Sequence, residues 1–174
     1  YILAIDAGTT GITILLFDNN AKIVKHAYSE FNQIYSKPSW VEHDPIEIWN
    51  TTQKLLDEIV ENIDPKSIAG IGITNQRETT VVRNKLTSMP ICNAIVWQCK
   101  RTSKKCEELI LEGYSDKIHS KTGLVIDSYF SGTKINWILN NITNAYDMAK
   151  RGELAFGTID TWLIWNLTHR KSHL

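Results

Sequence analysis

The chain opens with three short apolar segments that are separated by turn-forming residues. An unbroken apolar run covers residues 1–6 and ends in a carboxylate, and a second apolar run covers 12–18. The glycine-flanked turn Ala7-Gly8-Thr9-Thr10-Gly11 lies between them, and Asp18-Asn19-Asn20 precedes a third strand-like segment at 23–31. Because turns this short join neighbouring antiparallel strands, the sequence predicts a three-stranded antiparallel meander.

A helix with a well-defined start follows the meander. Asp44 is a good N-cap, Pro45 suits the first helical position, and Glu47 completes a capping box, together stabilising the helix by about 1 kcal/mol. The next apolar residues recur with helical spacing: Trp49, Leu55, Leu56, Ile59, Val60 and Ile63. We therefore predict a helix that begins at Pro45 and is ended by Asp64-Pro65.

The rest of the chain mixes strands and helices without a Pro/Gly/Ser linker. The pattern at 68–74 is typical of a buried strand, with shorter strands predicted at 79–83, 91–96 and 154–156. Helices are predicted at 102–111, 117–122, 131–141, 144–150 and 158–165, with Ser131 and Thr158 as caps. This order predicts an α/β domain with a mixed sheet flanked by helices, and it is similar to the ribonuclease-H-like half of actin-like ATPase domains.

Charge and composition exclude several classes of partner. Lys plus Arg and Asp plus Glu are both 19 in 174 residues, so a neutral chain gives no reason to expect nucleic acid or an anionic membrane surface. No apolar run is long enough to span a bilayer. Cys92, Cys99 and Cys106 are odd in number and lack C-x-x-C spacing, which indicates free thiols in a reducing, cytoplasmic setting. The five histidines show no metal-ligand spacing and are interpreted as surface or packing residues.

The first candidate for chemistry is the turn that follows the first strand. Gly8 lets the backbone approach a ligand closely, and the hydroxyls of Thr9 and Thr10 add donors to the backbone N–H groups, a combination that suits phosphate oxygens. Asp6 could hold a hydrated Mg²⁺, which takes one or two carboxylates and keeps several waters. On spacing alone, a plain hairpin turn explains the same residues.

The second candidate is a set of hydroxyl-binding side chains. Arg77 and Glu78 directly follow a predicted strand, and a guanidinium donor beside a carboxylate acceptor matches the hydroxyls of a polyol. Trp97 could cover the carbon side of such a ligand, and the hydroxyl of Tyr129 could bind to it. A surface ion pair explains Arg77 and Glu78 equally well, and packing alone explains the two aromatic residues.

Taken together, these segments resemble the N-terminal domain of the FGGY carbohydrate kinases, and among them the glycerol kinases, from about residue 2 to 168. The stretches Gln76-Arg77-Glu78-Thr79-Thr80 and Tyr129-Phe130-Ser131-Gly132-Thr133-Lys134 are typical of glycerol kinases, whereas Asp6-x-Gly8-Thr9-Thr10 is shared more widely. Further matching stretches are Pro38–Pro45, Asn93–Gln98, Gly123–Asp127 and Gly157–Leu163.

The resemblance implies transfer of the ATP γ-phosphoryl group to a terminal hydroxyl of glycerol. It places Gly8, Thr9 and Thr10 at the ATP phosphates and Asp6 near Mg²⁺. It places four residues at glycerol: Arg77, Glu78, Trp97 and Tyr129. It also implies that 1–174 is an incomplete N-terminal domain, with the catalytic-base Asp and the adenine pocket beyond Leu174, and that the complete protein is a cytoplasmic homo-oligomer.

Several positions depart from the family pattern. Thr13 replaces the usual Arg, Cys99-Lys100-Arg101 replaces Asp-Arg-Arg, Ser128 replaces Pro, and Arg83-Asn84 replaces Trp-Asp. Three alternatives stay open, and the departures at Thr13 and Cys99 support only the second of them. They are a kinase for another small polyol or sugar such as xylulose, ribulose or gluconate, a non-catalytic nucleotide- or polyol-binding relative, and an actin-like or chaperone-type ATPase.

Overall fold

The structure is a computed structural model that describes residues 1–173. The chain forms two compact units. The first unit contains Tyr1–Gln33, His43–Arg77 and the segment from Ile159 onward, and the second contains Ile34–Glu42 and Glu78–Thr158. The predicted site residues are divided between them.

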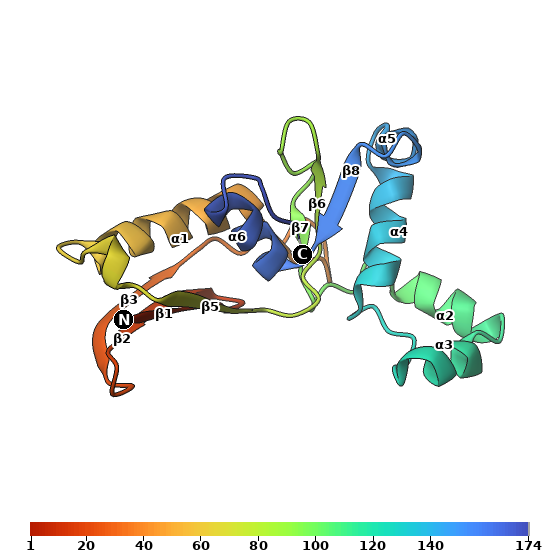
Figure 1. The fold of residues 1–174 in the computed structure, drawn as a ribbon. Coiled ribbons are helices and arrows are strands. Elements are labelled where there is room, and N and C mark those ends of the chain that lie inside the picture. Colours follow the sequence, from red (N-terminus) through yellow and green to blue (C-terminus); the bar gives the residue numbers. More distant parts are fainter. Residues whose placement is uncertain (174) are drawn as a thin grey trace. The chain divides into compact units, whose positions relative to one another are not determined.

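The first unit is built on a four-stranded mixed sheet. β1 (Ile2–Ala7), β2 (Gly11–Phe17) and β3 (Ile23–Glu30) pair antiparallel, which confirms the predicted meander. β5 (Gly70–Asn75) pairs with β1 in parallel, so the strand order is β3-β2-β1-β5 (Figure 1). The mixed sheet predicted from the sequence is therefore present.

Two helices of this unit lie on one face of the sheet (Figure 1). The Asp44 carboxylate accepts a hydrogen bond from the Ile46 N–H at 2.8 Å, so the predicted N-cap of α1 (Pro45–Val60) is confirmed. The indole N–H of Trp162 on α6 (Ile159–Leu167) donates to the Pro45 carbonyl at 2.7 Å and ties the two helices together. Between helices and sheet the core is apolar: Leu3, Ile5, Ala7, Ile12, Ile14, Leu16, Ile48, Leu55, Ile59 and Leu163 are buried.

Three local predictions in this unit were wrong. α1 ends at Val60 rather than near Ile63, and a short 3₁₀ helix, η1 (Pro65–Ser67), follows it. The Glu47 carboxylate accepts from the backbone and side-chain amides of Asn32 at 3.0 and 2.8 Å, and does not complete a capping box. β5, predicted to be buried, is largely exposed, because it lies at the edge of the sheet with β1 as its one neighbour there.

The second unit combines two small strand pairs with four helices. β4 (Glu42–His43), whose second residue is counted with the first unit, pairs with β7 (Ala94–Ile95). β6 (Val81–Asn84) pairs antiparallel with β8 (Leu154–Gly157). The helices are α2 (Ser103–Leu111), α3 (Ser115–Thr122), α4 (Ser131–Asn141) and α5 (Ala145–Lys150), close to their predicted ranges. Val82, Ile95, Cys99 and Ile138 form the buried centre.

The prediction that Ser131 caps α4 was also wrong. Phe130 occupies the N-cap position, and Ser131 is the first helical residue. Its hydroxyl binds the Glu78 carboxylate instead of a backbone amide of its own helix, because the charged acceptor is within reach. Across residues 1–173, no helix is long and apolar enough to cross a membrane.

Candidate functional site

In the first unit, the predicted phosphate-facing turn and Arg77 leave the same edge of the sheet. β1 and β5 run in parallel with Ala7 opposite Asn75, so the chain emerges from both strands side by side. Gly8, Thr9 and Thr10 form the turn from β1 to β2, and Thr10 is exposed. Arg77, also exposed, follows β5 by two residues. This edge, at the carboxyl ends of parallel strands, is where α/β sheets place ligands.

Asp6 lies near the end of β1 with an exposed side chain. Its cross-strand partners are Thr13 on β2 and Thr74 on β5, and residues directly opposite one another share a face of the sheet. Within the described residues no group of three or more His, Cys, Asp or Glu could hold a metal ion. One exposed carboxylate with hydroxyl neighbours fits a hydrated Mg²⁺, which needs few protein ligands.

Four successive carbonyls hold the turn against the body of the unit. The Ala7 carbonyl accepts from the Gln76 backbone N–H at 2.8 Å, and the Gly8 carbonyl accepts from the Gln76 side-chain amide at 3.2 Å. The Thr9 carbonyl accepts from the Gln33 side-chain amide at 3.0 Å, and the Thr10 carbonyl accepts from the Phe31 N–H at 3.3 Å. These bonds fix the backbone path of the turn in advance of any ligand.

His43 lies behind this turn and joins the two glutamines. Its Nε2 is 2.7 Å from the Gln33 side-chain oxygen, and its Nδ1 is 3.2 Å from the Gln76 side-chain nitrogen. Both bonds are satisfied when neutral His43 donates from Nε2 and accepts at Nδ1. The ring is completely buried, and burial lowers its pKa to about 4. No sequence pattern distinguishes this histidine from the other four.

In the second unit, one oxygen of the Glu78 carboxylate is held by Ser131, the first residue of α4. Glu78 is half-buried, and its Oε2 accepts from the Ser131 N–H at 2.9 Å and from the Ser131 hydroxyl at 2.7 Å. A carboxylate at the start of α4 is also favoured by the helix dipole. Within the described chain, Oε1 receives no hydrogen bond, so it can accept one from a ligand hydroxyl.

The two predicted aromatic residues lie beside each other in the same unit. The rings of Trp97 and Tyr129 make an edge contact with centroids 5.8 Å apart, and both residues are half-buried. The ammonium of Lys134 donates to the backbone carbonyls of Glu78 and Tyr129 at 2.7 and 2.6 Å. The structure therefore brings Glu78, Trp97 and Tyr129 together.

Lys134 was missed as a site residue, although it ends the Tyr-Phe-Ser-Gly-Thr-Lys stretch. Its side chain is completely buried, and burial lowers the pKa of its ammonium to about 8, an effect that the nearby Glu78 carboxylate opposes. No local pattern distinguishes it from an exposed helical lysine, because nothing in the sequence indicates that its side chain is buried.

Of the two departures at 99 and 100, Cys99 lies in the core of the second unit and Lys100 is exposed. Cys99 is completely buried and its sulfur accepts from the Arg101 Nε at 3.0 Å. The Arg101 guanidinium lies over the ring of Trp40, 3.9 Å from its centroid, and donates to Glu42 at 2.6 Å. Cys99 and Arg101 thus form a buried structural cluster, and Lys100 is exposed.

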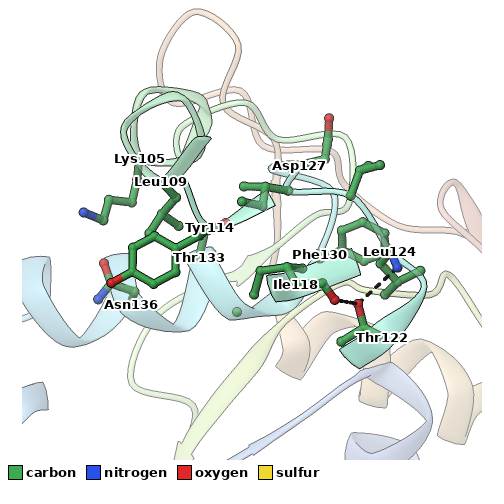
Figure 2. A pocket seen from close by; sticks show the side chains of 13 residues that line it. Lys105, Leu109, Tyr114, Ile118, Thr122, Leu124, Asp127, Phe130, Thr133 and Asn136 are labelled. Atoms are coloured by element: carbon green, nitrogen blue, oxygen red, sulfur yellow. Dashed lines mark hydrogen bonds between the residues drawn. The ribbon is translucent and has the colours of Figure 1, made fainter. Parts of the chain in front are cut away.

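An apolar pocket of about 390 Å³ lies between α2, α3, α4 and the segment that follows α3 (Figure 2). Leu109, Ile118, Leu124 and Phe130 are among its walls, with Asp127 at its rim. The predicted substrate-binding residues do not line it. Its mostly apolar surface offers little to a polyol, and the pocket is distinct from the cluster of Glu78, Trp97 and Tyr129.

Comparison with known proteins identifies the class. The family model described as "FGGY family of carbohydrate kinases, N-terminal domain" matches residues 1–173, so the chain belongs to the FGGY family of carbohydrate kinases. The chain is 56% identical over 176 residues to a glycerol kinase of Carboxydothermus hydrogenoformans and 57% identical to one of Thermoanaerobacter sp.. Each match covers the whole chain but 35% of the relative, so the chain spans about a third of their length.

Solved structures agree with this assignment. A Plasmodium falciparum glycerol kinase with ADP superposes with a TM-score of 0.92 at 36% identity, over 97% of this chain and 34% of that one. A xylulose kinase of Lactobacillus acidophilus reaches a TM-score of 0.85 at 23% identity, over 95% of this chain and 33% of that one. The second match shows the fold alone, and the predicted α/β fold with a mixed sheet is confirmed.

Proposed function

We propose that this chain is the polyol-binding and phosphate-facing part of an ATP-dependent glycerol kinase. The observation that carries the proposal is the Glu78 cluster: a carboxylate held at Oε2 with Oε1 available, beside an indole and a phenol. Identities of 54–57% to proteins named glycerol kinase favour glycerol over larger sugars.

Each residue has a distinct role in this proposal. Glu78 accepts a hydrogen bond from one glycerol hydroxyl, Arg77 donates to another, and the Tyr129 hydroxyl adds a third contact. Trp97 covers the carbon side of the ligand. A site built to bind hydroxyls in this way rejects analogues that lack them by about 10⁴–10⁵-fold.

ATP and Mg²⁺ are the proposed co-substrate and metal. The turn Gly8–Thr10 lies against the phosphates with the hydroxyls of Thr9 and Thr10 as donors, and Asp6 holds the hydrated ion. The metal, when bound, neutralises charge on the phosphate oxygens. The contribution of this chain is then positioning: it fixes the turn and the acceptor hydroxyl so that little movement remains before transfer.

The proposal also covers the complete protein. Residues 1–174 are assigned to the N-terminal domain, and the catalytic-base Asp and adenine pocket to sequence outside them. We place the complete protein in the cytoplasm. We also propose that it is a homo-oligomer, and light scattering on the purified protein would test this oligomeric state.

The experiment is to measure ADP release by the complete protein with Mg-ATP and glycerol, xylulose, ribulose or gluconate. We expect turnover with glycerol alone. Glu78→Gln should lower kcat/KM for glycerol by about 10- to 100-fold, because a charged acceptor is lost. Glu108→Gln, an exposed carboxylate on α2, is the matched control and should leave kcat/KM unchanged.

Turnover with a sugar instead of glycerol would overturn the roles of Arg77, Glu78 and Tyr129. Tight ATP binding without turnover of any substrate would favour the non-catalytic alternative, for which Thr13 in place of Arg is the specific observation.

A further inference from the structure

Two residues on the first turn of α4 bind Glu78, one at its carboxylate and the other at its backbone carbonyl. The Ser131 N–H and hydroxyl hold the carboxylate, and the Lys134 ammonium holds the backbone carbonyl at 2.7 Å. Because the two residues are three apart on one helix, they lie on the same side of it. A single helical turn therefore fixes both the side chain and the main chain of Glu78.

The backbone of Glu78 needs such support. Its φ of 63° lies in the left-handed region, which non-glycine residues adopt at a cost in free energy. The Glu78 carbonyl accepts from Lys134 and also from the Thr80 hydroxyl at 3.3 Å. These bonds compensate for a conformation that turns the carboxylate towards Ser131.

Lys134 is an unusual choice for packing alone. It is completely buried, and a buried ammonium costs free energy that an apolar side chain of similar volume would not. Its two hydrogen bonds go to the carbonyls of Glu78 and Tyr129, two of the predicted substrate-binding residues. The lysine thus joins the two segments that carry the polyol contacts.

On the basis of the proposed function, we propose that Ser131 and Lys134 are positioning residues that hold Glu78 and Tyr129 in the geometry required by the polyol. Neither needs to touch the substrate. Ser131 orients Glu78 so that Oε1 faces the ligand, and Lys134 keeps the Glu78 and Tyr129 backbones together.

The first test is Ser131→Ala in the complete protein. Loss of a hydroxyl donor to a carboxylate should lower kcat/KM for the polyol by about 10- to 100-fold while KM for Mg-ATP stays the same. Ser131→Thr keeps the hydroxyl and should restore most of the activity. Ser115→Ala, at the first residue of α3, is the matched control. Equal losses for Mg-ATP and polyol would show a merely structural role and overturn the proposal.

The second test asks whether Ser131 acts through Glu78. In a Glu78→Gln background, Ser131→Ala should cost much less than it does alone, because coupled residues are not additive. Additive losses would overturn the proposal.

The role of Lys134 is tested with Lys134→Met, with exposed Lys104→Met as the control. Lys134→Met should lower kcat/KM for the polyol and leave KM for Mg-ATP unchanged. If Lys134→Met fails to fold, the Ser131 series decides.

A third measurement separates this proposal from the proposed function. If the protein phosphorylates a different polyol, the same series is run with that substrate. If it phosphorylates none, the proposed function fails and amide hydrogen exchange decides. The first amide of a helix has no partner within the helix, so Glu78→Ala should speed exchange at Ser131 by at least about 10-fold and leave Ser115 unchanged. Unchanged exchange at Ser131 would overturn the positioning role.

Discussion

Thr13 stands where the family resemblance leads us to expect an arginine. Thr13 lies opposite Asp6 on the neighbouring strand, so its side chain shares a face with the proposed Mg²⁺ ligand. A guanidinium there could reach both the carboxylate and a phosphate. We predict that Thr13→Arg in the complete protein lowers KM for Mg-ATP by about 10-fold or more, the worth of one charge-assisted hydrogen bond.

The control for position 13 is Thr13→Met, which adds length without charge and should not improve ATP binding. Steady-state kinetics at fixed saturating polyol gives both values. An unchanged or weaker KM in Thr13→Arg would mean that position 13 does not face the phosphates.

His43 should make the free energy of unfolding depend on pH in the acidic range. Burial lowers its pKa from 6.5 to about 4, so the unfolded chain binds a proton at this site that the folded chain does not bind between these values. The free energy of unfolding should therefore fall as the pH is lowered from 6.5 to 4, by about 3 kcal/mol for this residue, and be unaffected by it above 6.5.

Urea unfolding across this pH range, compared with His43→Gln, checks the prediction. Glutamine does not titrate, so the variant should lose less stability between pH 6.5 and 4 than the native chain does. Parallel pH profiles for the two proteins would show that His43 is not held neutral by the fold.

At the scale of elements, the tight approach of β2 to β3 depends on Gly11. A Cβ at this position would lie 2.5 Å from the Ser29 carbonyl oxygen, which belongs to the backbone of β3 and cannot easily move. Gly11→Ala should therefore lower the free energy of unfolding by about 1–3 kcal/mol, as overpacking does elsewhere.

Gly132 is the matched control for Gly11, because a Cβ there meets nothing within 4 Å and the residue is in α4. Gly132→Ala should leave stability unchanged or raise it by up to about 1 kcal/mol, since alanine favours helix. Thermal or urea unfolding measures both. A Gly11→Ala variant as stable as the native chain would contradict the close approach.

The elements themselves were largely predictable because their signals are local. Turn residues delimit β1, β2 and β3, and Asp44-Pro45 marks the start of α1. What failed depended on distant partners: Glu47 binds Asn32, and Ser131 binds Glu78, and no local pattern indicates either choice. The exposure of β5 likewise follows from its place at the sheet edge, which is a property of the whole sheet.

The residues proposed to contact the ligand could be predicted from the sequence, but the buried residues that hold them in place could not. Motif resemblance singled out Glu78, Trp97 and Tyr129, which the structure brings together. The buried groups behind the site, His43 and Lys134, were not singled out, because a lone histidine or lysine has no sequence pattern that indicates burial. Supporting residues of this kind become visible once the hydrogen bonds are known.

At the scale of the molecule, the predicted site residues divide between the two units. Asp6, Gly8–Thr10 and Arg77 belong to the first unit, and Glu78, Trp97 and Tyr129 belong to the second. The change of unit falls within the Gln-Arg-Glu-Thr-Thr stretch, between two adjacent residues. The two residues proposed to bind glycerol hydroxyls from this stretch, Arg77 and Glu78, therefore belong to different units.

The chain covers only 35% of the length of the glycerol kinase that it matches, so it need not contain every residue that catalysis requires. If the catalytic base and the adenine contacts lie elsewhere in such a protein, the 174 residues alone should bind glycerol weakly and release no measurable ADP. A missing general base alone costs typically about 10²–10⁴-fold in rate, before the lost nucleotide contacts are counted. A coupled ADP assay with calorimetric titration of glycerol tests both halves, with Glu78→Gln as the control that should abolish the weak binding. Glycerol-dependent ADP release by the chain alone, absent in Glu78→Gln, would show that these residues already contain a working phosphoryl-transfer site.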